Sequence, residues 1–149
     1  MRLVIQRVKH ASCRVDNCVT GSCKDGYMIL VGMGLDDTKE IVEKLASKVA
    51  KLRIFNDEND KMNLSINDVN GSILSISQFT LYADCSKGNR PSFVNALSPD
   101  KAKELYLYFN ECLRNLGLHV EEGIFGADMK IDLLNDGPVT IIMDSKEML

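Results

Sequence analysis

The decisive stretch of the sequence spans residues 27–52 and reads YMILVGMGLDDTKEIVEKLASKVAKL. Its first five residues form a continuous apolar run of strand length that two glycines interrupt, which predicts a strand buried on both faces. Asp37, with Glu40 three residues later, has the form of a capping box, and apolar residues then recur at helical spacing. We therefore predict a helix over residues 38–52 directly after the strand, as in an α/β fold.

A second helix is predicted further along the chain. Ser98 is a suitable N-cap residue, and Pro99 then occupies the first helical position, where its missing N–H costs nothing. The apolar stripe that follows consists of Ala102, Leu105, Phe109, Cys112, Leu113 and Leu116. Gly117 ends this pattern, so the sequence predicts a second amphipathic helix between Pro99 and Gly117.

Short β-branched stretches predict the remaining strands. At the N-terminus, residues 3–8, 12–15 and 19–22, with an Asp16-Asn17 turn, are predicted to form a β-meander, and the buried strand at 27–31 follows it. After it, the predicted strands are residues 73–77, 118–124, 130–135 and 138–143. No repeat or linker divides the chain, so residues 1–149 are predicted to form a single α/β domain. Its two main helices are expected to pack outside a strongly curved, barrel-like β-sheet.

Charge and cysteine content exclude several classes of protein. The net charge of −3 argues against a large uniform basic surface for nucleic acid, but five cations against one acid in residues 1–24 leave room for a local RNA-facing patch. Five cysteines, with no secretory signal and no Cys-x-x-Cys pair, indicate free thiols. We expect no metal and no cofactor. Without a membrane-spanning apolar run, we expect a cytoplasmic protein and no membrane partner.

The first of three polar clusters reads Ser77-Gln78-Phe79-Thr80-Leu81. An apolar strand acquires an amide and two hydroxyls at its end, and groups on the end of a rigid strand are held in place as catalysis requires. The same pattern is also typical of an edge strand with a polar outer face.

The second cluster reads Lys87-Gly88-Asn89-Arg90-Pro91-Ser92-Phe93. Its two cations suit a phosphate backbone and its aromatic ring suits a base, but a charged surface loop has the same composition. The third cluster reads Asn135-Asp136-Gly137-Pro138-Val139-Thr140. Its proline interrupts two predicted strands, which favours a tight turn and also makes a cis peptide bond accessible.

These clusters, in this order and in a chain of this length, resemble the D-aminoacyl-tRNA deacylase family. The pairing of residues 77–80 with residues 135–140 is the most specific part of the resemblance. Further matches are MRLVIQRV at residues 1–8, LRIF at 52–55 and FGADM at 125–129, so the resemblance covers essentially the whole chain.

The resemblance implies hydrolysis of the ester bond of D-aminoacyl-tRNA, and of mischarged glycyl-tRNA, as chiral proofreading in translation. It implies a homodimer with active sites at the subunit interface, each receiving the 3′ end of aminoacyl-tRNA. The catalytic residues are implied to be Ser77, Gln78, Phe79 and Thr80. The substrate chirality gate is implied to be a cis Gly137-Pro138 pair that enters the partner's pocket. The substrate- or tRNA-binding residues are implied to be Lys87, Arg90, Phe125, Met129 and Asn135.

The sequence leaves the mechanism and two rival functions open. A Thr80 nucleophile needs an adjacent base, and neither His10 nor His119 lies in a polar cluster. We therefore favour backbone N–H groups near Phe79 and Thr80 as the oxyanion site, with the ribose 2′-hydroxyl activating water. One alternative is a non-catalytic dimeric tRNA-binding module. Another is a thiol hydrolase that uses Cys85 beside Lys87.

Overall fold

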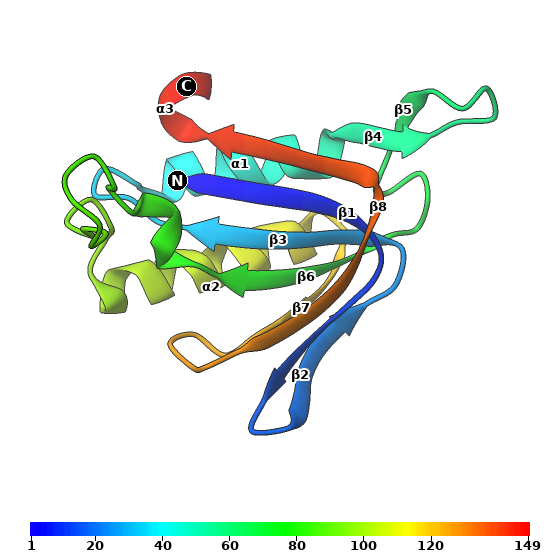
Figure 1. Cartoon of the computed structure of the whole chain (residues 1–149). Helices are drawn as coiled ribbons and strands as arrows, with labels where there is room; N and C mark the ends of the chain where they lie inside the picture. The colour runs from blue at the N-terminus through cyan, green and yellow to red at the C-terminus, as the bar shows by residue number, and fades with distance from the viewer.

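The computed structural model describes residues 1–149 and contains one strongly curved main sheet. Its strands are β1 (Arg2–Val15), β2 (Cys18–Cys23), β3 (Gly26–Gly32), β6 (Ser72–Ser77), β7 (His119–Glu122) and β8 (Lys130–Asp144). The hydrogen-bonded order is β2-β1-β3-β6-β7, and β8 pairs with β1. Halves of β1 and β8 bend away together with β2 and β7, so the sheet curls toward closure (Figure 1). The predicted barrel-like α/β fold is confirmed.

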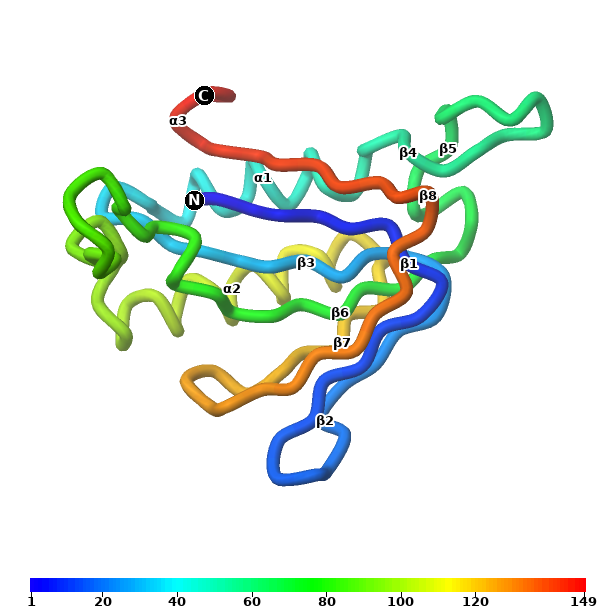
Figure 2. The backbone as a smooth tube through the Cα atoms, in the orientation of Figure 1, coloured from blue at the N-terminus to red at the C-terminus, as the bar shows by residue number.

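Two helices, α1 (Lys39–Lys51) and α2 (Pro99–Asn115), cover one face of this sheet (Figure 2). Their apolar stripes meet alternate residues of β1 and β3 in the main core. The most deeply buried members include Leu3, Ile5, Tyr27, Ile29, Leu45, Val49, Phe109 and Leu113. Both predicted helices are confirmed, and neither they nor α3 (Ser145–Met148) is long and apolar enough to cross a membrane.

The start of α1 differs from the prediction by one residue. Thr38, and not Asp37, is the N-cap residue, and its hydroxyl accepts from the Ile41 N–H at 3.4 Å. The Asp37 carboxylate instead accepts from the Gly34 N–H at 2.6 Å and pairs with the Met1 ammonium group. The local pattern assigned the Asp37 side chain to helix capping. In the structure this side chain instead forms a buried ion pair with Met1, the residue before β1.

The predicted β-meander is wrong in one respect, because residues 3–8 and 12–15 belong to a single strand. β1 is one strand of 14 residues, and β2 folds back onto its second half through a turn in which Asp16 and Asn17 both have positive φ. β3 then pairs with the first half of β1, from Arg2 to Val8, and not with β2. A strand this long offers two successive ladders, so β1 links the flat and the curled parts of the sheet.

A small hairpin outside the main sheet was not predicted. It consists of β4 (Arg53–Asn56) and β5 (Met62–Ser65). The acidic loop between them is a solvated turn in which the Asp57 carboxylate accepts from the Asn59 and Lys61 N–H groups at 2.9 and 3.1 Å. β4 matters for the functional site because its Ile54 carbonyl helps to hold Arg7 of β1.

The two predicted strands on either side of Gly137-Pro138 form the single strand β8. It pairs with β1 from Lys130 to Asn135 and again from Thr140 to Asp144, with register shifts between these ladders. The prediction of a tight turn here was wrong, because the chain continues in the same direction after a local excursion. The Gly137-Pro138 peptide bond in this excursion is cis.

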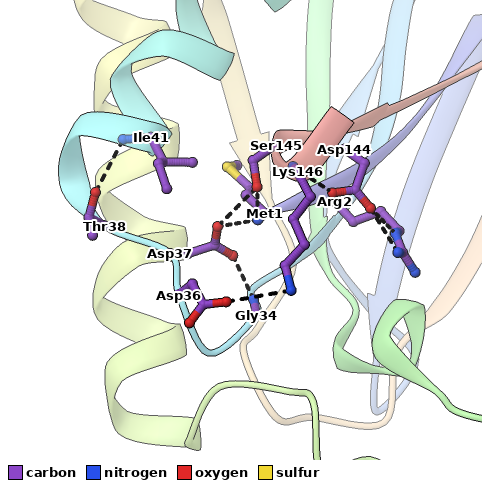
Figure 3. Close-up of polar contacts among 10 residues, drawn as sticks. All are labelled: Met1, Arg2, Gly34, Asp36, Asp37, Thr38, Ile41, Asp144, Ser145 and Lys146. Atoms are coloured by element: carbon purple, nitrogen blue, oxygen red, sulfur yellow. Dashed lines mark hydrogen bonds and ion pairs between the residues drawn. The ribbon is translucent and has the colours of Figure 1, made fainter. Parts of the chain in front are cut away.

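The two ends of the described chain meet beside the start of α1 (Figure 3). The Ser145 N–H donates to the Met1 carbonyl at 2.9 Å, and the Met1 ammonium group donates to Ser145 Oγ at 2.6 Å. Next to them, Asp144 Oδ2 accepts from two nitrogens of Arg2 at 2.7 and 2.8 Å. Burial opposes ionisation of Asp144, but the Lys146 N–H and Arg2 outweigh it, so the pKa of Asp144 is lowered.

Candidate active site

A cavity of about 270 Å³ opens where β6 runs beyond its neighbour β7. β7 pairs with β6 only as far as Ser75, so the last two residues of β6, Ile76 and Ser77, lie at an open edge. The predicted site residues that line the cavity are Ser77, Gln78, Phe79, Phe125 and Met129. The structure thus brings together two segments that are nearly fifty residues apart in the sequence.

The near wall of the cavity continues into η1 (Phe79–Tyr82), a single 3₁₀ turn. The Gln78 N–H donates to the Val31 carbonyl at 2.8 Å, which fixes the start of this turn against β3. A side chain at Gly32 would lie 3.1 Å from both the Gln78 carbonyl and Leu81, so the glycine allows this close approach. The Gln78 amide then donates to the Thr80 hydroxyl at 2.5 Å.

The N–H groups at the start of η1 are available to a ligand. Within the turn, the Leu81 N–H donates to the Gln78 carbonyl and the Ala83 N–H donates to the Thr80 carbonyl. The preceding N–H groups, those of Phe79 and Thr80, have no acceptor within the turn, as is general at helix starts. Both residues are exposed, and Phe79 lines the cavity whereas Thr80 lies just beyond the lining residues.

The far wall is the loop between β7 and β8. It is tied to β6 by the Gly123 N–H, which donates to the Ser75 carbonyl at 3.2 Å. The Phe125 ring lies 6.0 Å from the Tyr106 ring of α2, between ring centroids. Tyr106 and Ala102 also line the cavity and were missed by the sequence analysis. Their spacing of one helical turn was the available signal.

The cavity is mostly apolar and has no general base beside Thr80. Asp128 is the one charged residue in the lining, and it is exposed and paired with Lys130 at 3.1 Å. Burial raises the pKa of Tyr106 to about 12, so this phenol stays neutral and donates to the Ser75 carbonyl at 2.8 Å. His119 pairs with Glu121 on β7, and His10 is exposed on β1.

The predicted phosphate-binding residues lie in a separate loop at the cavity mouth. Backbone hydrogen bonds between Asp84 and Ser92, at 2.8 and 2.9 Å, close this loop. Phe93 then packs its edge against Phe79, with ring centroids 4.9 Å apart. Lys87 and Arg90 are exposed and do not line the cavity. Cys85, the thiol of the alternative hydrolase, is likewise exposed and outside the cavity lining.

The Gly137-Pro138 excursion lies outside the cavity of its own chain and is exposed. Asn135 brackets it from within β8, because its side-chain oxygen accepts from the Val139 N–H at 2.9 Å and its amide donates to Thr140 at 3.1 Å. Arg7, which is buried, donates to the Asp136 carbonyl at 3.1 Å and to the Ile54 carbonyl at 2.7 Å. The excursion is therefore held from two sides.

Comparison with known proteins decides the family. The model of the family described as D-Tyr-tRNA(Tyr) deacylase matches residues 4–144, which include all three polar clusters. The chain belongs to this deacylase family. The resemblance inferred from the sequence motifs is thereby confirmed.

Relatives of the deacylase family match over nearly their whole length. The chain is 58% identical to a D-aminoacyl-tRNA deacylase of Bacillus pumilus, covering 99% of this chain and 100% of that protein. It is 58% identical to one of Deinococcus deserti, covering 97% and 99%. A relative with this name in Clostridium perfringens is 54% identical over 99% of both chains.

Solved structures share the deacylase fold. The structure of the c-Myc DNA Unwinding Element Binding Protein superposes with a TM-score of 0.90 at 38% identity, covering 97% of this chain and 98% of that chain. A structure described as a probable eukaryotic D-amino acid tRNA deacylase gives a TM-score of 0.81 at 18% identity, covering 95% and 97%. The second likeness concerns the fold alone.

Proposed function

We propose that this member of the deacylase family hydrolyses the ester bond between a D-amino acid and the 3′ end of tRNA, releasing both free. The observation that carries the proposal is the apolar cavity whose rim is the 77–80 segment. That segment supplies two free backbone N–H groups and an oriented amide beside the cavity. In a chain of this family, this arrangement suits acyl transfer from an ester to water.

The proposed binding mode places the terminal adenosine near Phe79. This ring is 56% exposed and its orientation is fixed by Phe93, so one face is free to stack on a base. Lys87 and Arg90 are exposed in the loop that Phe93 ends, and we assign them to the phosphate backbone of the tRNA. Phe125 and Met129 line the opposite wall and contact the aminoacyl group.

In the proposed mechanism, water attacks the ester carbonyl while the Phe79 and Thr80 N–H groups stabilise the developing oxyanion. The ribose 2′-hydroxyl of the tRNA accepts a proton from the attacking water and passes its own proton to the 3′ oxygen, which leaves as a hydroxyl. Gln78 orients the end of the segment through its contact with Thr80. An aminoacyl ester is already labile, so positioning and charge stabilisation supply the main part of the acceleration.

We further propose a homodimer in which Gly137-Pro138 of one subunit faces the cavity of the other. The sheet face opposite the two helices supports this arrangement. Its cross-strand row runs from Ile142 of β8 through Val4 and Leu30 to Ile76 in the cavity lining. Ile142 is 68% exposed, which is unusual for a branched apolar side chain in a strand. Burying this row against a second copy brings the excursion of β8 toward a cavity.

The gate explains the proposed substrate range. Main-chain carbonyls fixed beside the α-carbon accept from the substrate ammonium group and leave no room for an L side chain. Glycine has no side chain to exclude, so mischarged glycyl-tRNA is included among the proposed substrates. Since aminoacyl-tRNA is used by ribosomes in the cytoplasm, we place the proofreading reaction there.

A time course with purified protein and D-tyrosyl-tRNA tests the proposed function. We expect many turnovers per subunit when the protein is present at about one hundredth of the substrate concentration, and much slower release from L-tyrosyl-tRNA. Release that stops at one equivalent or less would instead favour the non-catalytic tRNA-binding module. The basic loop would then have only a binding role.

Thr80→Ala is expected to retain substantial activity, within about tenfold of the unchanged protein, because no base lies beside its hydroxyl. The initial rate of D-tyrosyl-tRNA hydrolysis measures this effect. Cys85→Ala is the matched comparison for the thiol alternative, and we expect its rate to be unchanged. Complete loss of activity in a folded Thr80→Ala protein would instead support covalent catalysis.

A further inference from the structure

The η1 turn that carries the proposed oxyanion site is too short to hold its own position. It has a single turn of 3₁₀ geometry, and an isolated turn has little intrinsic stability. Its placement must therefore come from neighbouring elements. On one side the segment after β3 supplies a close contact, since a side chain at Gly34 would lie 2.7 Å from the Tyr82 ring.

The other side of η1 is held by Arg2. Its Nη1 donates to the Leu81 carbonyl at 2.7 Å, and its guanidinium lies 5.1 Å from the centroid of the Tyr82 ring. Carbonyls in the last turn of a helix have no N–H donor within the helix, so the Arg2 guanidinium supplies a donor to one of them. The Tyr82 hydroxyl is buried without a hydrogen-bond partner, which leaves ring packing to fix that residue.

The Arg2 guanidinium is itself fixed by Asp144 at the end of β8. Asp144 Oδ2 accepts from Nε and Nη2 of Arg2, and Asp144 Oδ1 accepts from the Lys146 N–H at 3.0 Å (Figure 3). Asp144 is 6% exposed, so the ion pair is largely shielded from solvent on its acidic side. A planar fork held on one edge is a rigid donor on the other.

We propose that Arg2 is a positioning residue for the active-site turn, which it couples to the end of the strand that carries the Gly137-Pro138 excursion. This inference rests on the proposed function, because it gives Arg2 a role in that reaction. Arg2 touches neither the cavity nor the substrate. It acts by holding the Leu81 carbonyl and the Tyr82 ring, so that the Phe79 and Thr80 N–H groups keep their direction.

Kinetics of Arg2→Gln and Arg2→Lys on D-tyrosyl-tRNA test the proposal. Arg2→Gln is expected to lower kcat by about tenfold or more with KM changed by less than about twofold, since a small displacement of catalytic groups is costly. Arg2→Lys is expected to recover part of kcat, because an ammonium group can reach one of the two partners but lacks the planar fork. Arg14→Gln, which removes an exposed Arg14–Asp132 pair from the same two strands, is the matched control and should match the unchanged protein.

Amide hydrogen exchange provides a readout that does not depend on turnover. The Ala83 N–H, which closes η1 on the Thr80 carbonyl, should exchange faster in Arg2→Gln, while amides in the middle of β3 stay protected. Asp144→Asn is a second variant for the case in which Arg2→Gln does not fold. It still caps α3 but loses the charge that orients Arg2, so the same changes are expected at smaller size.

The outcomes separate this inference from the proposed function. Folded Arg2→Gln or Asp144→Asn protein with unchanged kcat and unchanged Ala83 exchange would overturn the role of Arg2. If the unchanged protein does not hydrolyse D-tyrosyl-tRNA, the proposed function fails, and Ala83 exchange alone then decides whether Arg2 holds the turn.

Discussion

Gly137→Ala is expected to lower kcat/KM for D-tyrosyl-tRNA by about a hundredfold and to narrow the preference for the D over the L substrate. Gly137 has a φ of +125°, a conformation that L residues rarely adopt. A Cβ atom there would lie 2.9 Å from the Val139 side chain and 3.0 Å from an Arg7 nitrogen. The side chains can yield to these contacts, but the φ strain favours a backbone shift, and a shift of about 1 Å beside the reacting centre can cost two orders of magnitude.

The control for this substitution is Gly117→Ala. Gly117 also has a positive φ, of 87°, but no atom lies within 4 Å of the position that its Cβ would take. Both substitutions should cost stability, by about 1 kcal/mol for the backbone strain alone, so thermal unfolding is measured alongside the rates. Unchanged rates on both substrates for Gly137→Ala would remove the excursion from the mechanism. An equal loss in Gly117→Ala would attribute the effect to stability.

Ile142→Glu is expected to convert a dimer into a folded monomer that has lost at least about a hundredfold in activity. In a two-fold interface the same position is presented by both subunits, so each substitution buries two carboxylates. An unpaired buried charge costs several kcal/mol, which is enough to weaken association by more than a thousandfold. In the monomer no partner excursion reaches the cavity, so the gate is lost with the interface.

Analytical ultracentrifugation and the initial rate measure the two expected changes. Val19→Glu is the matched control, because Val19 is a 56% exposed β-branched residue on β2, outside the row from Ile142 to Ile76. It should leave both the sedimentation and the rate unchanged. A fully active monomer, whether the unchanged protein or Ile142→Glu, would show that the site is complete within one chain.

The sequence predicts the helices well because their signals are local. Apolar residues at helical spacing and the Ser98-Pro99 start mark α2 to within two residues. The cap of α1 was misplaced because Asp37 is used by a residue 36 positions away. No local pattern reports such a long-range ion pair. Strand pairing was also missed, since the pairing of β3 with β1 instead of β2 depends on the curvature of the whole sheet.

The candidate site was only partly predictable for a related reason. The motif residues at 77–80 and 125–129 were named from the sequence, but their meeting across the open edge of β6 depends on the early end of β7. Ala102 and Tyr106 belong to the cavity because of the side of α2 that faces this edge. Arg2 and Asp144 carry no catalytic motif at all. Their role follows from distances that only the folded chain provides.

The excursion of β8 is anchored by a ladder at each end, and this limits how the segment can change in evolution or design. Replacing its residues leaves both ladders intact, whereas inserting or deleting one residue must be absorbed by sliding one of them along β1. Side chains alternate between the faces of a strand, so a slide by one residue would move every side chain of that half to the opposite face of the sheet. The length of this segment should therefore tolerate less variation than its composition.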